Sequence, residues 1–168
     1  MKSVYQFISK LWKKPKKIDN NKNRLIQWRK EDTIVRVDKP TNLDRARRLG
    51  YKSKQGYIIV RVKTSKGKRQ KSRPRKTRKP KRIGVNKFTP KKGWQLIAEE
   101  RAQRRYPTLE VLNSYYVGED GQHKWYEIIM VDPNHPNIKS DKKISWIIND
   151  KKRAFRGRTS AGKKARGI

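Results

Sequence analysis

The segment Arg61–Arg82 constrains this chain most, because thirteen of its twenty-two residues are Lys or Arg and none is acidic. Apart from glycine and proline, its one apolar residue is Val62, too little to offset the roughly 1–2 kcal/mol of backbone entropy lost per ordered residue. Pro74 and Pro80 remove backbone donors and disfavour a helix or a central strand. We therefore expect an extended arm that binds a large polyanion. A flexible linker or a localisation signal is the alternative.

The whole chain shares this charge bias. It has 48 Lys and Arg against 14 Asp and Glu, a formal charge of +34 on 168 residues. Self-repulsion of that size opposes compaction until counter-charge is supplied. We therefore expect one small domain with appendages, and we expect part of it to become ordered only on its partner.

Composition also excludes several classes of chemistry. Cysteine is absent, so disulfides and thiolate metal sites are excluded, and His123 and His135 alone cannot make a His-rich metal centre. No apolar run reaches the eighteen or so residues of a membrane span, and the start lacks the features of a signal peptide. We expect a cytoplasmic protein without a cofactor, a membrane partner or a small-molecule substrate. Magnesium is expected only where it accompanies the bound polyanion, not as a cofactor of the protein itself.

After the arm the charge balance reverses, since Gly93–Asp132 holds seven acids against four bases. Thr89 and Pro90 suit the start of a helix whose apolar face runs over Trp94–Ala102. Alternating residues over 108–117 and apolar residues over 124–131, joined by the turn GEDG, predict an antiparallel hairpin. A short apolar segment, 144–148, precedes a final basic stretch.

Five elements are expected before the arm. Ser3 as N-cap and the stripe of Val4, Phe7, Ile8 and Leu11 predict a first helix that docks on the body or on a partner. Thr41 and Asp44 resemble a capping box. The full set comprises helices over Val4–Trp12, Asn23–Arg29 and Thr41–Gly50 and strands over Ile34–Val37 and Tyr57–Val62.

Two short motifs suggest other functions and are rejected. Gly157–Lys163 matches a P-loop except that Lys164 stands where the magnesium-binding Ser or Thr belongs. No apolar strand precedes it, so we expect its glycines to let a basic tail approach phosphates. Gln55–Val62 matches the RNP1 signature of RNA-binding sheets at few positions, and a core strand is the better interpretation.

A group of acids invites comparison with a metal-dependent nuclease. Glu119 and Asp120 fall in a turn, and no His or Asp adjoins Glu110 or Glu127 in the sequence. We therefore interpret these acids as solubilising surface carboxylates and expect no catalytic residue. The group considered consists of Glu110, Glu119, Asp120, Glu127, Asp132 and His135.

The remaining indication of function is the distribution of charge. Three basic zones, 45–54, 61–82 and 151–166, flank a near-neutral body, and arginine forks bind phosphate oxygens bidentately. An irregular arm suits crevices in folded RNA, whereas DNA readers place a helix or ribbon in a groove. An architectural DNA- or chromatin-binding protein remains the alternative.

Longer segments resemble one family. They are ARRLGYKSKQGY (46–57), KFTPKKGWQLIAEERA (87–102), LEVLNSYYVGEDG (109–121), YEIIMVDPNHP (126–136) and FRGRTSAGKKARG (155–167). Together they resemble, collinearly over nearly the whole chain, the ribosomal L15e family of archaeal and eukaryotic large subunits, and residues 87–141 look more similar to archaeal members. The resemblance implies an α+β fold in which a small mixed, mainly antiparallel sheet is flanked by helices, with long extended basic segments threading ribosomal RNA.

The resulting hypothesis is a structural, non-enzymatic constituent of the large ribosomal subunit. Its partners would be large-subunit ribosomal RNA and neighbouring large-subunit ribosomal proteins. We divide the single domain 1–168 into N-terminal helices (1–30), an α+β body (31–64 and 93–148), an internal basic arm (65–92) and a basic C-terminal tail (149–168). The residues expected to bind RNA are Arg45, Arg47, Arg48, Lys52, Lys54, Arg61, Lys63, Lys66, Lys68, Arg69, Lys71, Arg73, Arg75, Lys76, Arg78, Lys79, Lys81, Arg82, Arg153, Arg156, Arg158, Lys163, Lys164 and Arg166.

Overall fold

The structure, a computed structural model, describes residues 3–13, 21–67, 79–82, 84 and 90–168. Within these ranges it contains six α-helices, four strands and two short 3₁₀ helices, which confirms the α+β class. The elements in chain order are α1 (Val4–Lys13), α2 (Asn21–Lys30), β1 (Ile34–Val37), α3 (Leu43–Arg48), β2 (Tyr57–Ser65), the 3₁₀ helix Pro80–Arg82, α4 (Trp94–Arg105), β3 (Glu110–Glu119), β4 (His123–Val131), α5 (Pro136–Lys139), the 3₁₀ helix Ser145–Ile148 and α6 (Ser160–Arg166).

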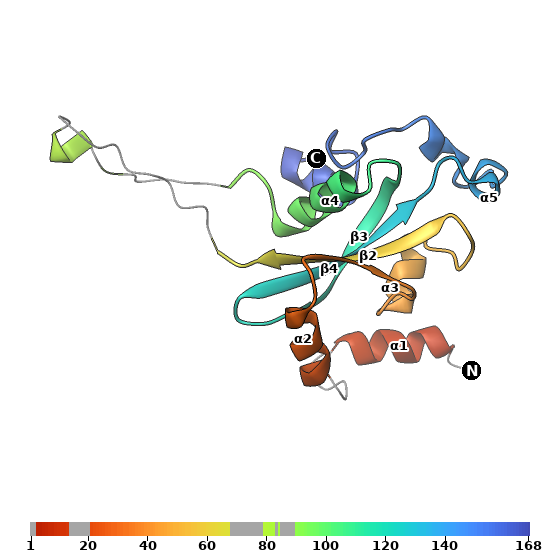
Figure 1. The fold of residues 1–168 in the computed structure, drawn as a ribbon, viewed down its shortest axis with the longest axis horizontal. Coiled ribbons are helices and arrows are strands. Elements are labelled where there is room, and N and C mark those ends of the chain that lie inside the picture. Colours follow the sequence, from red (N-terminus) through yellow and green to blue (C-terminus); the bar gives the residue numbers. More distant parts are fainter. Residues whose placement is uncertain (1–2, 14–20, 68–78, 83, 85–89) are drawn as a thin grey trace.

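The four strands form one sheet in the order β1-β2-β4-β3, and all three pairings are antiparallel (Figure 1). The predicted hairpin is confirmed as β3–β4, and its turn is closed by a 3.0 Å hydrogen bond from the Asp120 backbone N–H to the His123 carbonyl. β3 shifts register twice against β4, near Asn113 and near Gly118. Such irregularities increase the local twist of a sheet.

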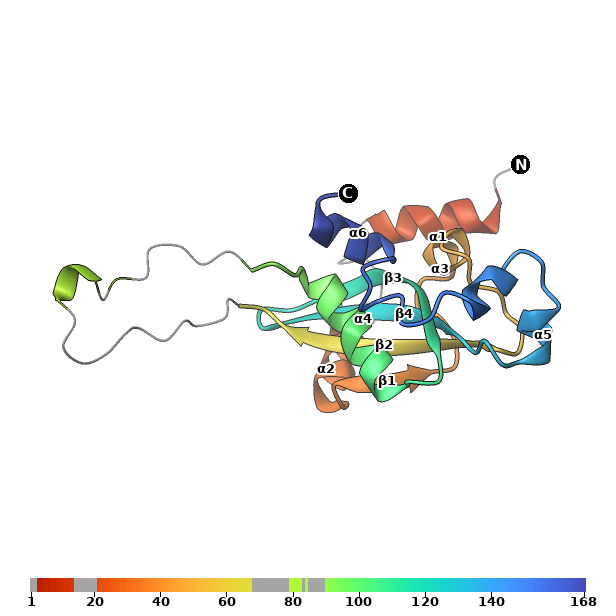
Figure 2. The same ribbon diagram turned by 90° about the horizontal axis from the view of Figure 1, so that it is seen from above.

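Both faces of the sheet are covered, because successive residues of a strand point to opposite sides. On one face Val60, Ile128 and Met130 pack beneath Ala98 and Ala102 of α4. Figures 1 and 2 show α4 and α6 on this side and α2 and α3 on the other. The opposite face carries the larger cluster, formed by Trp28, Ala46, Ile59, Leu112, Tyr115, Val117, Trp125, Ile129, Val131, Ile138, Ile144 and Ile147.

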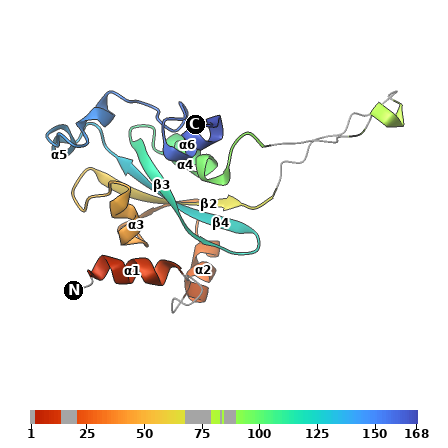
Figure 3. The same ribbon diagram turned by 180° about the vertical axis from the view of Figure 1, so that it is seen from behind.

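Helix α1 lies against α3, outside the layer that covers the sheet (Figure 3). The ring of Tyr5 lies 5.0 Å from the guanidinium carbon of Arg47 and forms part of this contact. Val4, Phe7 and Leu11 remain 70, 54 and 60 % exposed. The predicted helix is confirmed, but much of its apolar stripe is not covered by the described parts of the chain.

Two predicted helix starts are wrong. The N-cap of α3 is Asn42, whose side chain accepts from the Arg45 backbone N–H over 3.0 Å, while the Thr41 side chain bonds Glu127 instead. α4 begins at Trp94 with Gly93 as N-cap. The predicted cap Thr89 lies outside the described residues.

The limits of the predicted arm also change. β2 continues to Ser65, so residues 61–65 belong to the sheet, and the expectation of an extended arm from Arg61 is wrong for them. Parts of the expected tail are folded, because Ala154 and Ala161 are buried and α6 contacts α4 and β3. Among the described residues, no helix has the length and hydropathy needed to cross a bilayer.

Candidate nucleic-acid interface

Glu127 is not a surface carboxylate, contrary to the sequence interpretation. It lies in the centre of the sheet, in register with Arg61 of β2 and Tyr115 of β3, and it is 0 % exposed. The Tyr115 hydroxyl donates to Glu127 over 2.6 Å, Thr41 donates through its N–H and its hydroxyl, and Arg61 Nη1 lies 4.0 Å away. Burial of the Tyr115 hydroxyl, together with the adjacent Glu127 carboxylate, raises the pKa of Tyr115 above its usual range.

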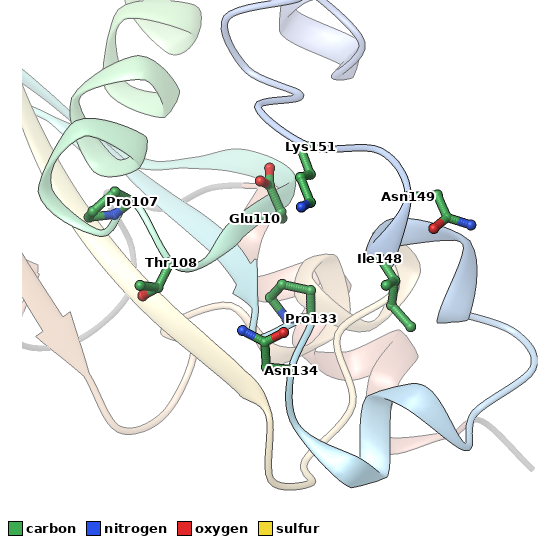
Figure 4. A pocket seen from close by; sticks show the side chains of 8 residues that line it. All are labelled: Pro107, Thr108, Glu110, Pro133, Asn134, Ile148, Asn149 and Lys151. Carbon is green, nitrogen blue, oxygen red and sulfur yellow. The ribbon is translucent and has the colours of Figure 1, made fainter.

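Glu110 is the second buried acid that the sequence placed on the surface. Its carboxylate accepts the backbone N–H groups of Lys152 and Arg153 over 2.9 and 3.4 Å and so holds the C-terminal segment on β3. Glu110 and Lys151 line a hollow of about 500 Å³, and Figure 4 shows their side chains next to each other. The remaining residues lining this hollow are Pro107, Thr108, Pro133, Asn134, Ile148 and Asn149.

Glu99 of α4 is a third buried carboxylate, and the hydroxyls of Ser114 and Thr159 donate to it. Burial raises the pKa of Glu99 above its usual value, against the opposing effect of the two hydroxyls. The buried carboxylates of Glu99, Glu110 and Glu127 therefore connect segments that lie far apart in the sequence. Across the described ranges, no three His, Cys, Asp or Glu side chains are grouped so as to hold a metal ion.

Several bases expected to bind RNA are engaged within the protein. The ammonium groups of Lys52 and Lys54 lie 2.6 and 2.7 Å from Asp141, and Lys54 also donates to the Asn137 carbonyl over 3.1 Å. These bonds lower the pKa of the Asp141 carboxyl and raise the pKa of Lys52. The two lysines thus tie the loop before β2 to α5 and to Asp141, which follows this helix.

The bases of β2 are engaged in the same way. Arg61 is 8 % exposed, bonds Glu31 over 2.6 Å and lies 4.6 Å from the Trp28 ring centroid. Lys63 donates to the carbonyls of Arg29 and Glu31 over 3.1 and 2.8 Å. Lys66, directly after the end of β2, donates to the Asp120 carbonyl over 2.5 Å and lies 3.4 Å from Glu119.

The arginines of α3 form an exposed basic group at the side of the sheet where α1 lies. Arg45, Arg47 and Arg48 are all exposed, since Asp44 and Ala46 are the residues that turn inward. Arg48 pairs with Asp44 over 3.1 Å, and Arg47 donates to the Tyr5 hydroxyl. These contacts hold the guanidinium groups of Arg47 and Arg48, and all three arginine side chains remain exposed.

The C-terminal bases form a second group, arranged around Asp150. This one carboxylate pairs with Arg153 over 2.6 Å, with Arg156 over 3.4 Å and with Arg158. Three bases around one acid leave an excess of positive charge. The exposed α6 bases Lys163 and Lys164 line a groove of about 400 Å³ together with Arg153, Arg158, Leu112, Asn113, Ser160 and Ile168.

The contact between Gly157 and Gly162 explains why both positions are occupied by glycine. A Cβ on Gly162 would lie 2.5 Å from the Gly157 Cα, and Gly157 has φ +64°, a conformation that favours glycine. Thr159 caps α6 by accepting the Gly162 N–H over 3.1 Å. This close approach orients α6 and the exposed side chains of Lys163, Lys164 and Arg166.

Of the arm 65–92, the structure describes residues 65–67, 79–82, 84 and 90–92. Lys79 and Lys81 are exposed, and Arg82 ends the 3₁₀ helix. Sequence reasoning did not single out Lys91, which lines a groove of about 300 Å³ with Lys164, or the exposed Trp146. The predicted RNA-binding residues outside the described parts are Lys68, Arg69, Lys71, Arg73, Arg75, Lys76 and Arg78.

The fold and these side chains define a small, strongly basic α+β protein whose buried acids are engaged in its own architecture. The family model described as Ribosomal L15 matches residues 3–168. The chain therefore belongs to the ribosomal L15e family, whose members are non-enzymatic structural proteins of the large ribosomal subunit, and it serves translation as part of that particle.

Proposed function

We propose that the chain binds folded large-subunit ribosomal RNA and holds neighbouring RNA segments together from its place in the ribosome of the cytoplasm. The observation that carries this proposal is the shortage of internal counter-charge. If each of the 14 acids neutralised one of the 48 bases, 34 positive charges would still need a partner. RNA phosphates supply such charge and release counterions on binding.

The proposed contacts are the exposed arginines and lysines of α3 and α6 together with the basic residues of the arm. The α3 group (Arg45, Arg47 and Arg48), the α6 group (Lys163, Lys164 and Arg166) and the arm residues 65–92 come from three separate parts of the sequence. The body formed by 31–64 and 93–148 would hold the α3 and α6 groups at a fixed separation, so that one protein reaches several RNA segments. Lys52, Lys54 and Arg61 would act indirectly, by stabilising that body.

Neighbouring ribosomal proteins are a second class of proposed partner. The exposed side chains of Val4, Phe7 and Leu11 on α1 would dock on such a neighbour, since an apolar stripe of this kind suits a protein surface better than phosphates. This contact is proposed in addition to RNA binding.

The proposal is tested by the salt dependence of binding to large-subunit ribosomal RNA. Replacing Lys163, Lys164 and Arg166 with Gln should reduce the slope of log K against log salt by about 2 to 3, at 0.7–0.9 for each lost phosphate contact. The matched control replaces three scattered, exposed lysines, Lys22, Lys39 and Lys139, with Gln. Equal effects of the two triple variants would contradict the proposed contacts.

DNA binding is the alternative outcome of the same titration. A duplex DNA with the same number of phosphates should bind more weakly than the folded RNA at every salt concentration, because DNA does not offer the crevices and unpaired bases of folded RNA. Equal or tighter binding to the duplex DNA would favour an architectural DNA-binding role.

A further inference from the structure

Trp146 is unusual among the tryptophans. All five lie in described parts of the chain; Trp28 and Trp125 are 4 and 1 % exposed, whereas Trp146 is 44 % exposed. Its indole N–H donates to the Lys143 carbonyl over 3.2 Å. This bond fixes the orientation of the ring at the surface of the 3₁₀ helix Ser145–Ile148.

A buried cation supports one face of this ring. The guanidinium carbon of Arg153 lies 4.5 Å from the indole centroid, and Arg153 is only 9 % exposed. The guanidinium is itself held by the Val111 carbonyl at 3.0 Å and by Asp150 at 2.6 Å. Because the cation covers one face, the exposed area of the indole belongs to its opposite face and its edge.

The charge around Trp146 indicates what would cover that face. Residues 139–158 contain eight bases and two acids, Asp141 and Asp150. Both acids are already engaged, Asp141 by two lysines and Asp150 by three arginines. A basic protein segment would be repelled from this surface, whereas a polyanion would be attracted to it.

We propose that Trp146 stacks on an unpaired nucleobase of RNA, while the exposed Lys142 and Lys143 contact the flanking phosphates. A fixed aromatic ring within a basic surface is the arrangement by which proteins bind unstacked bases. This site rests on the proposed RNA-binding function and adds to it a position where RNA must be single-stranded.

The test uses the full-length protein and a short single-stranded oligoadenylate at high salt, which screens phosphate contacts but not stacking. Trp146→Ala should weaken binding roughly 5- to 100-fold and leave the salt slope unchanged, because no phosphate contact is lost. Trp146→Phe should retain most of the affinity. Binding of a duplex RNA with the same number of phosphates should not change in either variant.

Tyr116→Ala is the matched control, because Tyr116 is similarly exposed at 43 % but lies on β3. The affinity of this variant for oligoadenylate should stay within about twofold of the wild type. A second measurement, tryptophan fluorescence, separates a loss of stacking from misfolding of Trp146→Ala. The oligoadenylate should quench tryptophan fluorescence in the wild type, and Trp146→Phe should lack that component.

Three results for Trp146→Ala would overturn the site. They are an unchanged affinity for oligoadenylate, an equal loss of affinity for the duplex RNA, or a weaker association with the large subunit while oligoadenylate binding is unchanged. The last would assign Trp146 to a protein neighbour. Failure of this site is distinguishable from failure of RNA binding as such, because the α6 triple variant would still reduce the salt slope with ribosomal RNA.

Discussion

Thr41 and Glu127 are joined by two hydrogen bonds although they lie 86 positions apart in the sequence. The Thr41 N–H donates to Glu127 over 2.9 Å, and the Thr41 hydroxyl donates to the other carboxylate oxygen. Since Glu127 is fully buried in β4, this pair attaches the start of α3 to the centre of the sheet. The exposed arginines of α3 are thereby placed relative to the rest of the surface.

Thr41→Val should lower the free energy of unfolding by about 1–3 kcal/mol, the usual cost of removing one partner of a buried polar group. The substitution keeps the shape of the side chain and removes only its hydroxyl donor. Urea denaturation at constant salt measures the effect. Thr33→Val, at an exposed position, is the control and should stay within about 0.5 kcal/mol of the wild type. Equal stability of the two variants would show that the Glu127 contact is not needed.

Gly162→Ala should destabilise the C-terminal segment, because the added methyl group would lie 2.5 Å from the Gly157 Cα. A clash with backbone costs about 1–3 kcal/mol, and it should increase amide exchange over 159–166. Gly93→Ala is the control, since a Cβ there meets no atom within 4 Å. If Gly162→Ala weakened RNA binding without any change in stability or exchange, the glycine would serve phosphate approach, as the sequence alone suggested.

Glu99→Gln should change how stability depends on pH. Burial raises the pKa of Glu99 in the folded state above its ordinary value of 4.5, so its stabilising contribution is complete below pH 4.5 and is lost as pH rises through the raised pKa. Gln stays neutral throughout. The stability of the wild type relative to Glu99→Gln should therefore fall with rising pH. Denaturation at several pH values and constant ionic strength measures this difference, and a constant or rising difference would be inconsistent with the burial of Glu99.

The sheet was predictable because its signal is local. Alternation and apolar runs over 57–62, 108–117 and 124–131 depend on neighbouring residues, and the GEDG turn fixes how two of these segments pair. The N-cap of α3 was missed because Thr41 and Asn42 are both good caps. Only a contact with Glu127, distant in sequence, decides between them.

The acids and bases were harder to place because burial of a charge depends on distant partners. Glu127 occupies a strand position that is buried only because α2 and α3 cover that face, and Arg61 lies beside it through strand register. Charge density alone could not separate Arg61, engaged by Glu31 and Trp28, from the exposed Arg45. The sequence therefore predicted a basic, RNA-binding chain, but not which bases would be accessible.

Protein–RNA cross-linking in intact large subunits, mapped to individual peptides, tests the central claim most directly. The proposal predicts cross-links to ribosomal RNA from three separate regions: residues 45–48 of α3, the arm 65–92 and residues 163–166 of α6. Peptides that contain the buried Glu127 and Ile129 provide the internal control and should not cross-link. Cross-links confined to ribosomal proteins, with none to RNA from these three regions, would contradict the account.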